Sequence, residues 1–166
     1  GVPQAVIGHS FGGKVALLLS GLIAIEQSWV LDAIPGEQPE QAQQELRTLF
    51  HHLRTAGAPF QSRELMKERL EEKHLPNTLI QWMTTNLSKT DKGYDWTFNL
   101  ANATEMIEDY FQLDAYPFLQ DTSHPIHIVR ARNNNRWTKE TLSEILSVGP
   151  LVHLHTLERA DHWVHI

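Results

Sequence analysis

The chain of 166 residues contains no cysteine, so neither disulfide bonds nor a thiol nucleophile enter its chemistry. It also lacks an apolar run long enough to cross a membrane. Positive charge is scarce, because 14 Lys and Arg are outnumbered by 20 Asp and Glu, which gives a formal net charge of −6. No basic patch is visible, so neither a nucleic acid nor an anionic membrane is an expected partner.

The most informative stretch lies near the start of the chain, where Gly8-His9-Ser10-Phe11-Gly12 matches the pattern Gly-x-Ser-x-Gly. A short apolar run, Ala5-Val6-Ile7, precedes it, and a helical pattern follows it from Lys14 to Leu19. A strand, a sharp turn and a helix form the context in which this motif presents a nucleophilic serine. The alternative is a glycine-rich loop before a helix, such as a phosphate cradle. Neither a Gly-x-Gly-x-x-Gly pattern nor a Walker-type lysine accompanies it, however.

Within this motif, Ser10 is the predicted nucleophile. The sharp turn would force Ser10 into a strained backbone conformation, which is tolerated only when its neighbours are very small. We expect Gly8 and Gly12 to supply that smallness, because a Cβ at either position would collide across the turn. The backbone N–H of Phe11 would then point to where an oxyanion forms, at the positive end of the helix dipole.

The apolar pattern predicts a β-α-β unit at the start of the chain and a further α/β segment at its end. The predicted strands are residues 4–7, 29–31, 125–130 and 151–157, and the predicted helices beside them are 12–25 and 139–147. Residues 37–122 are more polar, and their periodicity predicts helices near 38–56, 62–73, 77–88 and 102–113. We therefore expect a parallel-sheet α/β core formed by residues 1–36 and 123–166, with residues 37–122 inserted as a helical lid.

A serine hydroxyl needs a base within hydrogen-bonding reach and a carboxylate that orients this base. His162 follows the last predicted strand and is expected at the sheet edge that carries Ser10, so His162 is the predicted base. His165, three residues further on, is more simply explained as a packed or surface residue.

Two positions are usual for the acid in this chain order. One is the loop after the next-to-last strand, residues 130–137, which contains no carboxylate. The other is the end of the strand after the serine-bearing turn and its helix, so Asp32 is the predicted acid. A turn-forming role for Asp32 is the alternative. Asp161 adjoins His162, but its side chain would normally point away from the imidazole.

Side chains near the predicted triad and on the lid are predicted to line an acyl pocket, namely His9, Trp82, Trp96, Phe98 and Trp163. For the lid members, ordinary packing in the lid core is the alternative. The ten histidines invite a metal hypothesis. His153 and His155 share a predicted strand face, yet no third ligand has suitable local spacing. We expect neither a metal site nor a cofactor.

These residues resemble the α/β-hydrolase superfamily, and they are most similar to the small esterases of the bacterial YbfF type and their plant and algal relatives. The resemblance runs over essentially the whole chain and rests on Val6-Ile7-Gly8-His9-Ser10-Phe11-Gly12-Gly13-Lys14, Val30-Leu31-Asp32-Ala33-Ile34-Pro35-Gly36, Trp96-Thr97-Phe98-Asn99-Leu100 and His162-Trp163-Val164-His165. It implies Ser10 as nucleophile, His162 as base and Asp32 as acid. The sequence departs at Asp161, where these esterases usually have glycine.

The same resemblance implies that the chain corresponds to the C-terminal portion of a hydrolase. The family has strands before the serine turn, a loop that supplies a second oxyanion N–H, and a helix after the catalytic histidine. We therefore expect a missing N-terminal segment, or self-association through the open sheet edge. We also expect little activity from this stretch alone, because one oxyanion donor typically contributes about 10²–10³ in rate. A soluble protein of the cytoplasm or a plastid is implied as well.

The predicted function is hydrolysis of a small-molecule carboxylic ester through an acyl-Ser10 intermediate. Two alternatives stay open. One is a ligand-binding module that keeps the fold and pocket but turns over little or nothing. The other is acyl transfer or C–C bond hydrolysis on the same triad.

Overall fold

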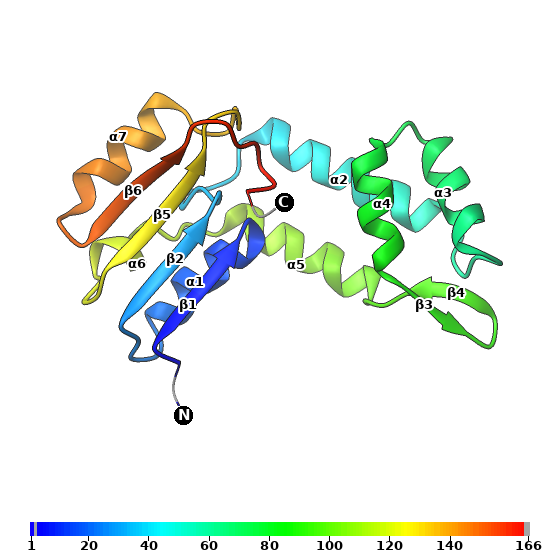
Figure 1. Ribbon diagram of the computed structural model, residues 1–166, viewed down its shortest axis with the longest axis horizontal. Coiled ribbons are helices and arrows are strands. Elements are labelled where there is room, and N and C mark those ends of the chain that lie inside the picture. The colour runs from blue at the N-terminus through cyan, green and yellow to red at the C-terminus, as the bar shows by residue number, and fades with distance from the viewer. Residues whose placement is uncertain (2, 165–166) are drawn as a thin grey trace. The chain divides into compact units, whose positions relative to one another are not determined.

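The computed structural model describes Gly1 and residues 3–164. The chain divides into two compact units, the first formed by Gly1–Pro39 and Gln112–Ile166 and the second by Glu40–Phe111 (Figure 1).

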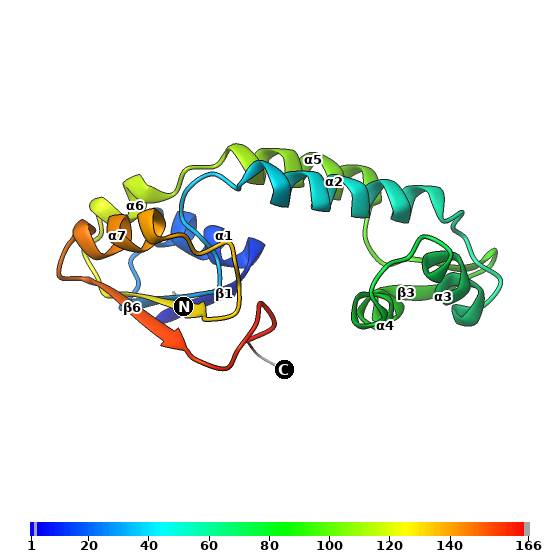
Figure 2. The ribbon, with the colours of Figure 1, turned by 90° about the horizontal axis from the view of Figure 1, so that it is seen from above.

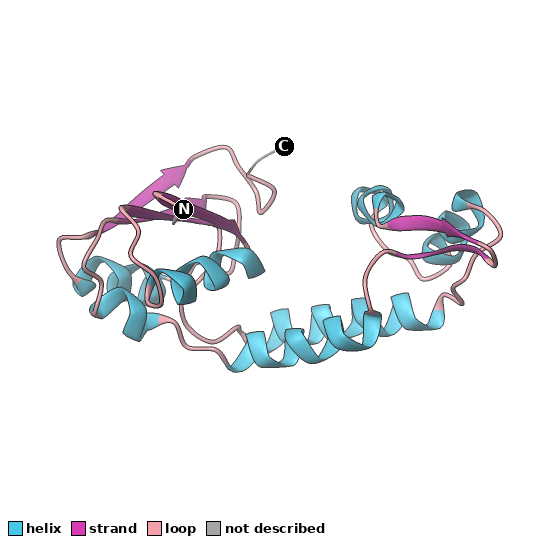
Figure 3. Ribbon diagram, turned by 90° about the horizontal axis from the view of Figure 1, so that it is seen from below, coloured by secondary structure: helices cyan, strands magenta, loops and turns pink. Residues whose placement is uncertain are grey.

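The first unit is built on a parallel four-stranded sheet with the order β1-β2-β5-β6 (Figure 1). Its strands are β1 (Ala5–His9), β2 (Gln27–Leu31), β5 (Ile126–Ala131) and β6 (Val152–Leu157). The helices of this unit are α1 (Phe11–Ser20), α6 (Tyr116–Gln120) and α7 (Lys139–Val148). All three helices lie on one face of the sheet (Figures 2 and 3). Because the strands are parallel, their carboxyl ends meet at one edge, where ligands bind in open α/β sheets.

The core of this unit lies between the sheet and its helices. Apolar side chains that alternate along the strands meet those of the helices there, and the members are Leu17, Val30, Ala33, Ile34, Ala115, Leu119, Ile126, Ile128, Trp137 and Ile145. The four strands were predicted within two residues of their observed bounds, because apolar runs are a local signal. The first predicted helix, 12–25, was extended too far, since α1 ends at Ser20. The parallel-sheet α/β class is confirmed.

Residues 112–122 belong to the first unit, although the sequence analysis assigned them to the inserted helical segment. Ala115 and Leu119 are wholly buried in the core beneath the sheet. The Ala115 N–H donates to the carbonyl of Pro35 at 2.9 Å, and the buried Lys14 Nζ donates to the carbonyl of Leu113 at 2.6 Å. The five-residue helix α6 was not predicted, because it is too short to show a helical period.

The second unit is mainly helical. It contains α2 (Glu40–Thr55), α3 (Arg63–Glu71), α4 (Asn77–Thr85), the strands β3 (Leu87–Thr90) and β4 (Gly93–Trp96), and most of α5 (Leu100–Gln112). The two strands form an antiparallel hairpin that the sequence analysis did not predict. Its first strand falls where the predicted helix 77–88 was extended too far, since α4 ends at Thr85. No helix in the described part of the chain is long and apolar enough to cross a membrane.

The turn between β1 and α1 depends on glycine, but at positions that differ in part from the prediction. A Cβ at Gly8 would lie 1.9 Å from the carbonyl oxygen of Gly12, as the sharp turn requires. A Cβ at Gly12 would meet nothing within 4 Å, so the expectation that Gly12 must be small is wrong. A Cβ at Gly13 would instead lie 2.6 Å from Cβ of Ala33. Close packing of α1 on the sheet, rather than the turn itself, therefore explains the second small residue.

We predict that Gly13→Ala lowers the free energy of unfolding by about 1–3 kcal/mol, the usual cost of inserting a methyl group into a packed core. Gly12→Ala is the matched control. It adds the same methyl group one residue earlier in α1 and is expected to keep or raise stability by up to about 1 kcal/mol, since alanine favours a helix. Urea denaturation of both variants measures the difference. Equal stability of the two variants would contradict the close contact at Gly13.

Candidate active site

Ser10 lies at the carboxyl end of β1, directly before α1. Its φ of 54° and ψ of −120° are strained for a residue with a side chain. The Ser10 N–H donates to the carbonyl of Leu31 at 2.9 Å, and the Ser10 carbonyl accepts from the Gly13 N–H at 2.9 Å. Phe11 is the first residue of α1, at the positive end of the helix dipole. The strand, strained serine and helix reproduce the geometry that the motif predicts.

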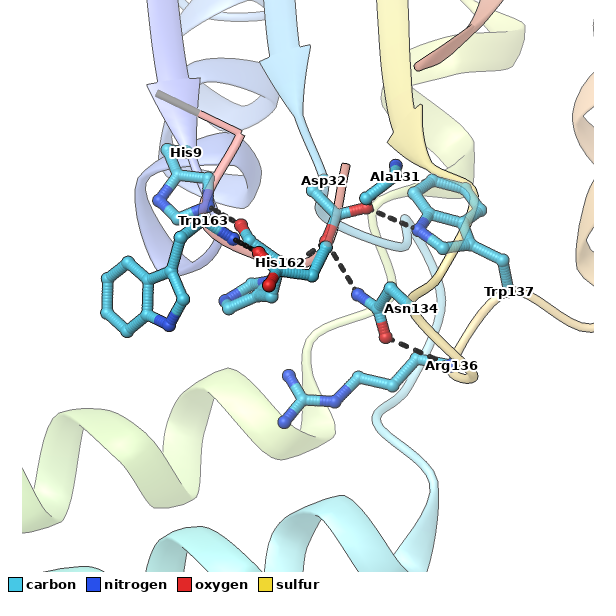
Figure 4. Close-up of polar contacts among 9 residues, drawn as sticks. His9, Asp32, Ala131, Asn134, Arg136, Trp137, His162 and Trp163 are labelled. Atoms are coloured by element: carbon cyan, nitrogen blue, oxygen red, sulfur yellow. Dashed lines mark hydrogen bonds and ion pairs between the residues drawn. The ribbon is translucent and has the colours of Figure 1, made fainter. Parts of the chain in front are cut away.

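Asp32 follows β2 directly, and its carboxylate is wholly buried. Two donors reach Oδ1, namely the Ala131 N–H at 2.7 Å and the indole N–H of Trp137 at 2.6 Å. Two more reach Oδ2, namely Nδ2 of Asn134 at 2.6 Å and Nδ1 of His162 at 2.8 Å. Figure 4 shows the carboxylate between His162 on one side and Ala131 and Trp137 on the other. Asp32 itself has a φ of 47°, so its backbone is also strained.

These four donors determine the charge of the Asp32 carboxyl group. Burial alone would raise its pKa, because the charged form loses its hydration. The hydrogen bonds from His162, the Ala131 N–H, Asn134 and Trp137 outweigh that effect, and the pKa of Asp32 lies below its ordinary value. The carboxyl group is therefore ionised at neutral pH.

His162 lies in the loop after β6, with its side chain 27% exposed. Because the ionised Asp32 can only accept, Nδ1 of His162 carries a proton and donates it at 2.8 Å. In the neutral ring this leaves the lone pair on Nε2, which is the tautomer that a general base needs. The backbone of His162 is also held, because its carbonyl accepts from Nε2 of His9 at 2.6 Å (Figure 4).

The three predicted residues thus converge on the carboxyl edge of the sheet. The Ser10 N–H donates a hydrogen bond to the carbonyl of Leu31, the residue before Asp32. Nε2 of His9, the residue before Ser10, donates to the carbonyl of His162. Among the described residues, the Ser10 hydroxyl makes no hydrogen bond to the His162 ring. Catalytic hydrogen bonds are often long without substrate and shorten in the complex. The pair Asp32–His162 is therefore formed in this structure, whereas the link from Ser10 to His162 is not.

The residues predicted to line a pocket fall in two places. His9 and Trp163 lie beside the His162 ring, with ring centroids at 4.8 Å and 5.7 Å from it. Trp82, Trp96 and Phe98 belong to the second unit, where Trp96 and Phe98 pack on its core and Trp82 is 48% exposed. Packing in that core accounts for Trp96 and Phe98, and a pocket role for the five residues stays a prediction.

Asp161 and His165, near the end of the chain, are the alternatives to the predicted acid and base. Oδ1 of Asp161 accepts from the Trp163 N–H at 3.0 Å, so this carboxylate closes its own loop and does not contact the imidazole. The loop therefore accommodates Asp161 at the position where the resemblance leads one to expect glycine. His165 lies outside the described residues.

Asn134 and Trp137 are functional candidates that the sequence analysis missed. Both lie in the loop between β5 and α7, which was noted only because it lacks a carboxylate. One feature of the sequence could have identified them. The loop at the alternative acid position is rich in amide side chains and carries a tryptophan, and these groups can donate hydrogen bonds to a carboxylate elsewhere on the same sheet edge.

His153 and His155, the pair weighed as metal ligands, lie in a ring cluster on the sheet with His127 and Trp29. His127 stacks on Trp29 with ring centroids 4.2 Å apart, and Nδ1 of His127 lies 3.1 Å from Nε2 of His155. His153 stacks on His127 at 4.9 Å. Within residues 3–164, no group of three or more histidine or acidic side chains is placed to hold a metal ion.

Comparison with known proteins gives the family. The profile described as "Alpha/beta hydrolase family" matches residues 1–166. The chain is 25% identical to the sn-1-specific diacylglycerol lipase ABHD11 of Xenopus laevis, over 96% of this chain and 52% of that protein. It is 22% identical to the esterase YbfF of Escherichia coli strain K12, over 96% of this chain and 60% of that protein.

The fold agrees with this match. A marine microorganism esterase superposes with a TM-score of 0.83 at 20% identity, over 97% of this chain and 64% of that chain. The chain spans about half the length of the curated relatives it matches. The family profile covers every residue, and the sheet with its strained serine has the architecture of the solved relative. The chain belongs to the alpha/beta hydrolase family.

Proposed function

We propose that this chain carries the catalytic triad of a serine hydrolase that cleaves carboxylic esters, with Ser10 as nucleophile, His162 as base and Asp32 as acid. The observation that supports it most directly is the buried, ionised Asp32 bonded to Nδ1 of His162. This contact lies at the sheet edge where Ser10 occupies its strained turn.

The proposed reaction has two stages, the formation and then the hydrolysis of the acyl-Ser10 intermediate. Oγ of Ser10 attacks the ester carbonyl carbon while Nε2 of His162 takes its proton, and the carbonyl oxygen becomes an oxyanion beside the Phe11 N–H. The tetrahedral intermediate then expels the alkoxide, which leaves as the alcohol with the proton from His162. Water next attacks the acyl-Ser10 carbonyl, gives one proton to His162, and the acid is released as Ser10 recovers that proton. Asp32 holds the tautomer and stabilises the imidazolium throughout.

The substrate class follows from the relatives and from the composition of the second unit. An esterase and a diacylglycerol lipase both act on carboxylic esters, so an ester with an apolar acyl group is the proposed substrate. We propose that the second unit is the lid of this hydrolase, and a pocket role for its aromatic side chains, among them the exposed Trp82, stays a prediction. No metal or cofactor has a role in this mechanism.

Covalent labelling with a fluorophosphonate tests the proposal, because only an activated serine reacts. We expect one phosphonyl group per chain, located on the peptide that contains Ser10, and no labelling of Ser10→Ala. Hydrolysis of p-nitrophenyl esters, measured on the same samples, shows whether turnover follows. Absence of labelling in a folded chain would refute the hydrolase proposal and favour a ligand-binding module.

A further inference from the structure

We propose that Asn134 and Trp137 are positioning residues that hold the Asp32 carboxylate in one orientation and so hold the His162 ring in the tautomer and orientation of a base. Neither residue belongs to the predicted triad or pocket. The kinetic part of the inference rests on the proposed function, whereas its effect on the hydrogen bond between Asp32 and His162 does not.

The Asn134 side chain is fixed at both ends. Its Oδ1 accepts from the Arg136 N–H at 3.1 Å, which defines the orientation of the amide group. Its Nδ2 therefore faces Asp32 and donates to Oδ2 at 2.6 Å. This is the same oxygen that accepts from Nδ1 of His162 at 2.8 Å. The amide and the imidazole thus share one carboxylate oxygen, and the charge available to one depends on the other.

Trp137 holds the second oxygen. Its side chain is part of the core beneath the sheet and the residue is only 8% exposed, so the indole ring cannot move freely. The indole N–H donates to Oδ1 of Asp32 at 2.6 Å, beside the Ala131 N–H at 2.7 Å. With two donors on each oxygen, rotation of the carboxylate would break bonds at both ends.

Removing the Asn134 or the Trp137 donor changes the negative charge on the Asp32 carboxylate oxygen to which it donates. A hydrogen bond to a charged oxygen withdraws negative charge from it. Without the Asn134 donor, Oδ2 carries more charge toward His162, and the imidazolium becomes more stable. The hydrogen bond from Nδ1 of His162 to Oδ2 of Asp32 then becomes stronger, because this oxygen is no longer shared with the amide. The less constrained carboxylate also orients the ring less well, so kcat falls.

Other charged groups around His162 stay the same in this substitution. His9 packs on the ring from β1, Asp161 lies next to it in its own loop, and Arg136 lies near Asn134 in the loop after β5. Asn134→Ala removes no charge and leaves these groups in place. A shift in the NMR signal of the His162 Nδ1 proton therefore reports the lost hydrogen bond.

The test compares Asn134→Ala with Asn135→Ala, which makes the same change at the exposed neighbouring position in the same loop. We expect Asn134→Ala to lower kcat about 10- to 100-fold, the range typical of groups that orient a reacting residue. KM should be unchanged. The NMR signal of the Nδ1 proton of His162 should move downfield, as expected for a stronger hydrogen bond to Oδ2 of Asp32. Asn135→Ala should match the unsubstituted chain in all of these measurements.

Trp137→Phe gives a second test that keeps an aromatic ring in the core and removes only the N–H. It should shift the signal of the His162 Nδ1 proton in the same direction, and thermal unfolding shows whether either variant is merely unstable. An unshifted Nδ1 proton signal in folded Asn134→Ala and Trp137→Phe would overturn the inference, even if activity fell. If the unsubstituted chain neither hydrolyses esters nor takes up fluorophosphonate, the proposed function fails, yet the NMR comparison still decides the positioning role.

Discussion

Replacing His162 with alanine is expected to lower kcat for ester hydrolysis by about 10⁶-fold, a loss as large as that expected from removing the Ser10 nucleophile itself. His162 is the only described histidine that contacts the Asp32 carboxylate, and it does so through Nδ1. Without the ring, the Ser10 hydroxyl keeps its proton and is a weak nucleophile at neutral pH. Steady-state hydrolysis of p-nitrophenyl acetate measures the loss.

The control for this substitution is His153→Ala, which removes an exposed imidazole from β6, the strand that leads into the His162 loop. It should leave kcat within about threefold of the unsubstituted chain, as is usual for surface changes away from a site. Labelling gives an independent measurement, since His162→Ala should also lose the rapid reaction of Ser10 with fluorophosphonate. Undiminished labelling of His162→Ala would show that Ser10 is not activated by this ring.

Each member of the proposed triad carries a local signal in the sequence. Ser10 lies in a five-residue motif with a strand before it and a helix after it, and His162 follows the last apolar strand. Asp32 required one further step, namely that the other usual acid position contains no carboxylate. Chain order and strand ends were sufficient to predict that these residues lie at one sheet edge, because all parallel strands bring their carboxyl ends together there.

The features that were missed depend on distances between remote parts of the chain. Trp137 reaches Asp32 across 105 positions, and no periodicity encodes that contact. The same holds for Gly13, which is small because Ala33 packs against it, whereas Gly12 has open space. The hairpin β3–β4 was missed because its strands have four residues each, too few for a reliable alternation of apolar side chains.

Asp32→Asn is the second substitution with a large expected effect, and it should lower kcat about 10⁴-fold with the site otherwise intact. The ionised carboxylate forces Nδ1 of His162 to carry the proton. A neutral amide removes this constraint, so the ring can adopt the tautomer whose Nε2 holds a proton and cannot accept one from Ser10. The amide NH₂ also has no lone pair for the donors from Asn134 or Trp137, so stability should fall as well.

The direction in which the pKa of Asp32 is shifted determines how the loss of stability in Asp32→Asn depends on pH. Because the folded-state pKa of Asp32 lies below its ordinary value, the ionised carboxylate stabilises the folded chain at pH values above about 4. This contribution is lost as the pH falls through the folded-state pKa. The difference in unfolding free energy between the chain and Asp32→Asn should therefore be largest near neutral pH and shrink in acid, as urea denaturation at several pH values would measure.

Asp161→Asn is the matched control, since it neutralises the carboxylate next to His162 in the sequence. Among residues 3–164, Oδ1 of Asp161 accepts only from the Trp163 N–H, and the amide oxygen of asparagine can accept the same bond. Its kcat should stay within about threefold of the unsubstituted chain. The reverse result, a large loss in Asp161→Asn and a small one in Asp32→Asn, would transfer the role of the acid to the neighbouring carboxylate. The four hydrogen bonds at Asp32 would then serve folding alone.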